Sequence, residues 1–164
     1  MILCYLTGTP GTGKSTVANI LADRVHASVI EINDLIIKEG HFWGYDIHRD
    51  SLIIDEGRLF VSITERVEEK ENHILVGLPM DLRGLSLLSI IVLRCDIATL
   101  RRRLVPRGYS SEKVEENIQS EIMGIILDQM VSWFPNTPIL EIDTTYRSPE
   151  ETVTTIENFT KKLI

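Results

Sequence analysis

The chain has 164 residues, of which 43% are apolar and 25% are charged, and these values are typical of a single globular domain. Its 17 basic and 24 acidic residues give a net charge of −7, which argues against broad, direct binding of nucleic acid or membranes. The two cysteines lie in apolar segments, as expected of buried thiols in a reducing compartment, and the apolar run at the N-terminus is too short for a signal peptide. We therefore expect a cytoplasmic protein.

Apolar runs along the chain predict a sheet of about five strands. The strands are expected at residues 2–6, 28–32, 74–76, 89–93 and 139–142. Helices are expected at residues 13–25, 34–38, 56–71, 97–104, 112–130 and 149–163. Because strands alternate with helices and are apolar on both faces, the sequence predicts one α/β domain over residues 1–164. Its parallel sheet is expected to have helices on both sides.

Helix-start signals and two interruptions refine this prediction. Asn33 and Asp34 offer an N-cap for the short second helix, Asp96 offers one for the fourth, and Ser148 begins a capping box. Residues 40–55 lose all sustained periodicity and are interpreted as a segment that faces a substrate, within an insertion at residues 33–55. Residues 105–112 contain proline and glycine and predict a second insertion between two helices.

The most specific motif is the segment GTPGTGKST at residues 8–16, which fits the phosphate-loop pattern between an apolar strand and a helix. Its glycines allow backbone N–H groups to converge on phosphate oxygens, and the helix adds its positive end. Lys14 would contact the β and γ phosphates, Ser15 would ligate Mg²⁺, and Thr16 would contact the α phosphate. The motif predicts binding of a purine nucleoside triphosphate.

A cluster of four arginines is the second signal. Arg101, Arg102, Arg103 and Arg107 fall within a helix end and the following Pro/Gly break. Phosphoryl transfer needs mobile cations that cover the charge of the transferred group. Arg101 and Arg102 are explained more simply as a solvated helix face that pairs with nearby acids. Arg103 and Arg107 are candidates for substrate contact, and Arg107 is the best candidate for a catalytic arginine of a lid.

Together these motifs resemble the adenylate kinase isoenzyme 6 family, the archaeal and eukaryotic nucleoside-monophosphate kinases tied to maturation of the small ribosomal subunit. The matching stretches are GTPGTGKST, YDIHRDSLIIDEGRL and VLRCDIATLRRRLVPRGYSSEKVEENIQSEI. The third is the most specific, because Arg-Gly-Tyr at residues 107–109 and the helix after it look like the family's lid. The resemblance covers nearly the whole chain.

The resemblance implies a P-loop NTPase fold with a monophosphate-binding insertion at 33–55 and a lid at 105–112. It also implies transfer of the terminal phosphate of ATP to AMP or a related nucleoside monophosphate, with weaker ATPase activity. It assigns the ATP phosphates to Gly11, Gly13, Lys14, Ser15 and Thr16, and the lid role to Arg107. Asp34 begins the monophosphate insertion.

The chain departs from the family pattern at two places. Val76 and Leu78 stand where the family usually has an aspartate and a histidine, and neither can hold a Mg²⁺-bound water or orient a nucleophilic one. Asp81 follows at a different spacing. Lys38 lies one position beyond the family's usual arginine, and would bind the monophosphate as a point charge.

Three functions fit these motifs. The first is the kinase reaction, which the two insertions on a phosphate-loop core favour. The second is a nucleotide-regulated ribosome assembly factor with little kinase activity. The acidic charge suits a basic small-subunit ribosomal protein as its partner. The third is a small-metabolite kinase related to shikimate kinase, which the lid motif makes a minor option.

Overall fold

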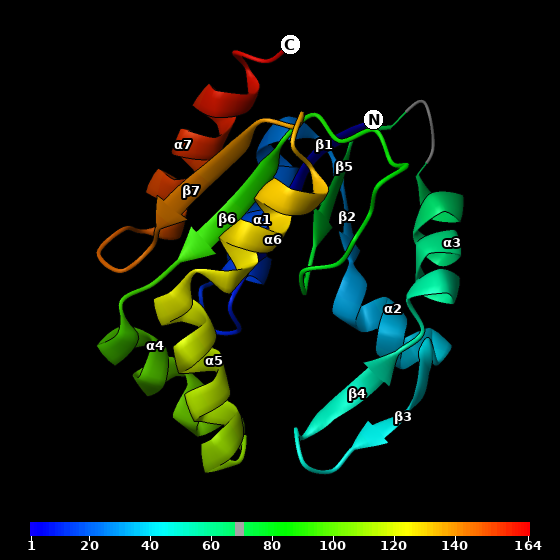
Figure 1. Cartoon of the computed structure of the whole chain (residues 1–164). Coiled ribbons are helices and arrows are strands. Elements are labelled where there is room, and N and C mark those ends of the chain that lie inside the picture. Colours follow the sequence, from blue (N-terminus) through cyan, green and yellow to red (C-terminus); the bar gives the residue numbers. More distant parts are fainter. Residues whose placement is uncertain (68–70) are drawn as a thin grey trace.

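The computed structural model describes residues 1–67 and 71–164, and its core is a five-stranded parallel sheet (Figure 1). The strands are β1 (Ile2–Gly8), β2 (Ser28–Glu31), β5 (His73–Val76), β6 (Ile90–Arg94) and β7 (Ile139–Asp143). Their order across the sheet is β2-β5-β1-β6-β7, so the strand that leads into the phosphate loop lies at the centre. The predicted strands and their parallel arrangement are confirmed.

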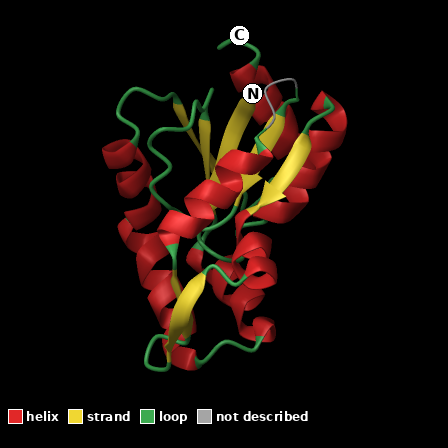
Figure 2. Cartoon of the chain, turned by 90° about the vertical axis from the view of Figure 1, so that its right-hand side faces the viewer, coloured by secondary structure: helices red, strands yellow, loops and turns green. Residues whose placement is uncertain are grey.

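Helices cover both faces of this sheet, as predicted (Figures 1 and 2). On one face α1 (Lys14–Val25) and α7 (Pro149–Thr160) pack against Cys4 and Leu6 of the central strand. On the other face Tyr5 packs in the cluster that includes α3 (Glu56–Arg66) and α6 (Ile125–Trp133). Alternate residues of one strand therefore enter different cores, which explains why the strands read as continuous apolar runs.

The first insertion comprises α2 (Ile32–Glu39) and an antiparallel hairpin of β3 (Phe42–Asp46) and β4 (Ser51–Ile54). The prediction that Asn33 or Asp34 caps α2 is wrong. The helix already begins at Ile32, and Glu31 stands at the N-cap position without a side-chain cap. Ile32 is fully buried in the core, so packing rather than a polar cap fixes where this helix starts.

The second insertion, residues 105–112, runs from the end of α4 (Ile97–Leu104) through a 3₁₀ turn at Val105–Arg107 into the start of α5 (Ser111–Met123). Asp96 caps α4 as predicted, because its carboxylate accepts a hydrogen bond of 3.0 Å from the Thr99 N–H. The single helix predicted for residues 112–130 is wrong. Gly124 adopts φ +66° and divides it into α5 and α6, a left-handed joint that glycine forms without strain.

Two further boundaries differ from the prediction. The third helix ends at Arg66 instead of residue 71, and residues 68–70 of the predicted helix lie outside the described residues. The capping box of α7 is confirmed by reciprocal hydrogen bonds between Ser148 and Glu151, but this helix ends at Thr160. None of the described helices is long and apolar enough to cross a membrane. Both insertions project beyond the carboxyl ends of the strands (Figure 1).

Candidate active site

The loop between β1 and α1 has the backbone geometry that the phosphate-loop motif requires. Gly8 ends the central strand, and a Cβ atom on it would lie only 2.4 Å from the carbonyl oxygen of Leu93. Gly13 has φ +95° and occupies the N-cap position of α1, a conformation that favours glycine. These glycines let the chain turn sharply from strand to helix. The turn leaves the positive end of α1 available to an anion.

Lys14 is folded back over this loop. Its ammonium group donates hydrogen bonds to the carbonyl oxygens of Gly8, at 2.7 Å, and Thr9, at 3.1 Å. Burial and, to a smaller extent, the nearby Arg107 guanidinium lower the pKa of Lys14 to about 8, although Glu31 and Glu121 act in the opposite direction. Lys14 is therefore a cation that gains from an anionic partner.

Two cavities meet at the phosphate loop. The first has a volume of about 400 Å³ and lies between the loop, α4 and the segment from β7 to α7. It is lined by Gly11, Thr12, Gly13, Thr16, Val17, Arg103, Arg107, Thr144, Arg147, Pro149 and Thr152. We call it the loop-side cavity. It contains Gly11, Gly13 and Thr16, three of the five residues expected to bind ATP.

The second cavity has a volume of about 700 Å³ and opens between the two insertions, so we call it the cleft cavity. One end is charged and includes Lys14, Ser15, Arg49 and Arg107. The rest is lined by apolar and amide side chains from residues 78–79, α5 and α6, with Gln129 among them. Gly11 and Arg107 line both cavities, so Arg107 stands where the two meet.

The arginine cluster divides into exposed residues and residues that lie at the phosphate loop. Arg101 is exposed and forms an ion pair with Glu115. Arg103 instead turns toward the loop, where its guanidinium donates a hydrogen bond of 3.2 Å to the Gly11 carbonyl oxygen. Arg107 lies in the 3₁₀ turn directly before Gly108, which has φ +75°. Arg103 near the end of α4 and Arg107 in the second insertion therefore lie at the loop, whereas Arg101 belongs to a solvated face.

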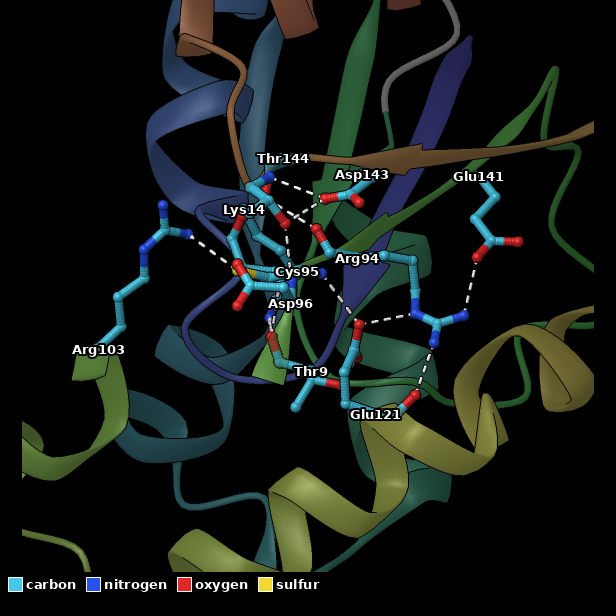
Figure 3. A network of polar contacts seen from close by, with 12 residues as sticks. Thr9, Lys14, Arg94, Cys95, Asp96, Arg103, Glu121, Glu141, Asp143 and Thr144 are labelled. Atoms are coloured by element: carbon cyan, nitrogen blue, oxygen red, sulfur yellow. Dashed lines mark hydrogen bonds and ion pairs between the residues drawn. The ribbon is translucent and has the colours of Figure 1, made fainter. Parts of the chain in front are cut away.

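A buried carboxylate joins α5 to the phosphate loop, and the sequence reasoning gave it no role of its own (Figure 3). Glu121 is 3% exposed and accepts hydrogen bonds from the Thr9 hydroxyl, the Arg94 guanidinium at 2.7 Å and the Cys95 N–H at 3.0 Å. Glu121 thus connects α5 both to the phosphate loop and to the end of β6. An acidic residue on the apolar side of the predicted helix was the available signal.

The structure does not bring Asp34 and Lys38 to either cavity. These residues form an exposed ion pair of 2.7 Å one turn apart on α2, a pairing that solvent makes weak. Two other residues of the first insertion, Asn33 and Arg49, line the cleft cavity instead. Asn33 also accepts a hydrogen bond of 3.3 Å from the Leu78 N–H through its amide oxygen.

Val76 and Leu78, which stand where the family usually has an aspartate and a histidine, lie in different surroundings. Leu78 lines the cleft cavity, whereas Val76 is fully buried in the apolar cluster on the α1 side of the sheet. Asp81 is held in a salt bridge by the Arg83 guanidinium, which keeps the pKa of this carboxyl below its usual value. Among the lining residues of the cleft cavity, Glu116 is the acidic one.

The described residues contain no group of three or more His, Cys, Asp or Glu side chains that could hold a metal ion by themselves. Ser15 offers a hydroxyl oxygen beside Lys14 in the cleft cavity. Mg²⁺ keeps most of its waters and is commonly bound through substrate phosphates with one or two protein oxygens. The donors present therefore fit Mg²⁺ that arrives with a nucleotide.

Comparison with known proteins shows which family the chain belongs to. The family model described as AAA domain matches residues 5–124, which include the phosphate loop, both insertions and Glu121. The chain belongs to this AAA-domain family. Two archaeal relatives carry the name "Putative adenylate kinase". The protein of Methanosarcina barkeri is 37% identical over 95% of this chain and 84% of its own length. That of Methanocaldococcus jannaschii is 39% identical over 90% of this chain and 80% of its own length.

Family membership makes the chain a phosphotransferase with a nucleotide-binding P-loop. Solved structures support the fold. A gluconokinase from Sinorhizobium meliloti 1021 superposes with a TM-score of 0.60 at 15% identity and covers 98% of this chain and 94% of its own. A sugar kinase from Janibacter sp. HTCC2649 superposes with a TM-score of 0.64 at 15% identity and covers 96% and 93%.

Proposed function

We propose that the chain transfers the terminal phosphoryl group of ATP to AMP or a related nucleoside monophosphate. The observation that carries this proposal is the junction of two cavities at one phosphate loop, with Arg107 lining both. A hydrolase needs one nucleotide site and a water, whereas transfer between two nucleotides needs two sites that meet at the transferred group. The names of the archaeal relatives support the same reaction.

In this proposal the loop-side cavity takes the adenosine of ATP and the loop takes its phosphates. Gly11, Gly13 and Thr16 would contact the phosphates, and Arg103 would bind substrate above the loop. Residues 105–112 would act as the lid. Closing it would bring Arg107 over the γ phosphate and exclude water.

The cleft cavity would take the acceptor, with residues 33–55 as the acceptor-binding insertion. Its charged end suits a phosphate, and its apolar and amide end suits a nucleobase. Neither Asp34 nor Lys38 lines this cavity, so the proposal gives the acceptor contacts to Asn33 and other residues of the insertion.

Lys14 and Arg107 would be the catalytic residues. An acceptor phosphate oxygen forms a bond to the γ phosphorus while the bond from this phosphorus to the β–γ bridging oxygen breaks, and ADP leaves. Lys14 would leave its two carbonyl partners to hold the β and γ phosphates, and Arg107 would balance the charge on the transferred group. Ser15 would hold Mg²⁺, which supplies further charge neutralisation.

A coupled assay of ADP formation, run with and without each nucleoside monophosphate, tests this function. We expect ADP formation to depend on AMP or a related monophosphate. Lys14→Ala should lower it on the order of a hundredfold or more, because a cation at the developing charge is lost. The far-ultraviolet circular dichroism of this variant should match the wild type. ADP formation that is equal with and without every acceptor would overturn the proposal.

The ribosome assembly role is the second candidate. The hairpin exposes Trp43, Tyr45 and Ile47, which are 74%, 53% and 82% accessible, in a chain of net charge −7. A basic small-subunit ribosomal protein would suit such an apolar and acidic surface. This candidate predicts that the chain binds that protein only with ATP present. It also predicts little acceptor-dependent ADP formation, and the coupled assay measures this second quantity.

A further inference from the structure

Arg49 occupies a defined position at the tip of the β3–β4 hairpin. The Asp46 carboxylate accepts hydrogen bonds from the His48 N–H at 2.9 Å and from the Arg49 N–H at 3.1 Å, so it closes the turn around its own backbone. Asp50 follows with φ +48°, a conformation that asparagine and aspartate tolerate better than most residues. The backbone that carries Arg49 is therefore held by its own turn.

The same tip reaches the second insertion. Asp50 accepts a hydrogen bond from the Tyr45 hydroxyl on its own hairpin. Its carboxylate also interacts with the Ser110 N–H at the start of α5 and with the charge of Lys113. These partners hold the pKa of Asp50 below its usual value, with Tyr45 the largest cause. The hairpin tip thus reaches the start of α5, which lies on the other side of the cleft cavity.

Arg49 lines this cavity together with Lys14, Ser15 and Arg107. Among the described residues no acidic side chain forms an ion pair with Arg49, whereas Lys38 of the same insertion is paired with Asp34. Lys14 and Arg107 are already committed to the transferred phosphate in the proposed reaction. Arg49 is the basic side chain that the first insertion contributes to the lining.

We propose that Arg49 binds the phosphate of the acceptor nucleotide, an assignment that rests on the proposed kinase function. A guanidinium can hold two phosphate oxygens at once, and this leaves the third oxygen free to attack the γ phosphorus. Two anionic phosphates must approach each other in the reaction. Arg49 beside the acceptor phosphate and Arg107 between the two phosphates supply positive charge that offsets the repulsion between these phosphates.

Steady-state kinetics of Arg49→Ala test this assignment. The KM for the nucleoside monophosphate should rise roughly tenfold to hundredfold, because a charge-assisted hydrogen-bond pair is lost. The KM for ATP should stay unchanged, since Arg49 does not line the loop-side cavity. Arg49→Lys should lie between the wild type and Arg49→Ala, because lysine keeps the charge but loses the two-pronged geometry.

Arg101→Ala is the matched control, because it removes an exposed guanidinium that is paired with Glu115 and lines neither cavity. Its kinetic constants should match the wild type. Isothermal titration of AMP into each variant gives a readout independent of turnover, and circular dichroism checks folding. An Arg49→Ala variant with the wild-type KM and affinity for AMP overturns the assignment, as does a larger effect of Arg101→Ala. Failure of the proposed function is distinct, since the wild type itself would then form no acceptor-dependent ADP.

Discussion

Lys14 combines an essential charge with a weakened basicity. Its pKa is lowered to about 8, so the ammonium form dominates below pH 8 and is lost as the pH rises through this value. A bound phosphate favours the ammonium form, and ATP binding near pH 8 should therefore take up a proton. The two thiols do not titrate in this range, because burial raises the pKa of Cys4 to about 12 and also raises that of Cys95.

We therefore predict that the affinity for ATP falls as the pH rises above about 8. Arginine keeps its charge throughout this range, so the affinity of Lys14→Arg should be lower but independent of pH. Dissociation constants measured by calorimetry between pH 6.5 and 9.5 check this prediction, with buffers of different ionisation enthalpy to count the protons. A wild-type affinity that is flat across this range would show that Lys14 stays charged.

Leu78 leads to a second prediction, which concerns the rate of ATP hydrolysis in the absence of an acceptor. A leucine in the wall of the cleft cavity cannot orient water, and Asp81 is engaged by Arg83. Hydrolysis should therefore be slow relative to transfer onto AMP, whose nucleophile is already an anionic oxygen. Leu78→His should raise the rate of hydrolysis more than the rate of transfer.

Parallel measurements of phosphate release and ADP formation check the prediction on Leu78. Val76→Asp is unsuitable as a partner change, because this position is buried in an apolar cluster and the carboxylate would destabilise the fold. If the wild type hydrolyses ATP as fast as it phosphorylates AMP, another group orients water. Asp81→Asn would then identify Asp81 by a loss of hydrolysis.

At the scale of elements, Glu121 connects α5 to the phosphate loop and to the end of β6. Glu121→Ala leaves Arg94 with the exposed Glu141 as its remaining carboxylate partner and removes the acceptor of the Thr9 hydroxyl. Loss of one partner from a buried pair costs about 3 kcal/mol, and the melting temperature should fall by roughly 6–12 °C for a chain of this size.

Glu115→Ala provides the matched comparison for Glu121→Ala. It removes another glutamate from the same helix, but the ion pair with Arg101 is exposed and should contribute little. Differential scanning calorimetry of the two variants measures the contrast. Equal melting temperatures for both variants would mean that the buried network does not stabilise the junction of α5 with the phosphate loop.

The sequence allowed most elements and the loop to be predicted, and the exceptions have physical causes. Apolar runs reveal strands that are buried on both faces, and Asp96 and Ser148 mark helix starts because their caps are local. The break at Gly124 was hidden, since apolar residues continue on both sides of it. The start of α2 was hidden as well, because the burial of Ile32 is a tertiary effect.

The same distinction holds for the site. The phosphate loop is local, and its spacing alone places Lys14 and Ser15. Lys38 stays a prediction from the family pattern; in the structure it pairs with Asp34 one turn away on the helix surface and lines neither cavity. Arg49 could not be found from spacing, since its position depends on how the hairpin folds over the cleft cavity.

At the scale of the whole molecule, two cavities that meet at one loop should bind one bridged ligand. We predict that two adenosines joined by five phosphates bind more tightly than ATP or AMP and therefore stabilise the chain more than either nucleotide at equal ligand concentration. At a concentration of about 100 times its dissociation constant the ligand contributes about 2.7 kcal/mol, a rise in melting temperature of roughly 5–10 °C. Thermal shift measurements test this, with Lys14→Ala as the control. A rise no greater than that with ATP alone would contradict it.

The two cavities share the phosphate loop and Arg107, but the rest of their walls come from different parts of the chain, and this has a consequence for how the fold can be reused. The loop-side cavity adds α4 and the segment from β7 to α7, whereas the cleft cavity adds the hairpin, residues 78–79, α5 and α6. The second set of walls can therefore change while the first stays intact. The fold is shared with a sugar kinase at 15% identity, so one arrangement of strands and helices can carry different acceptor walls.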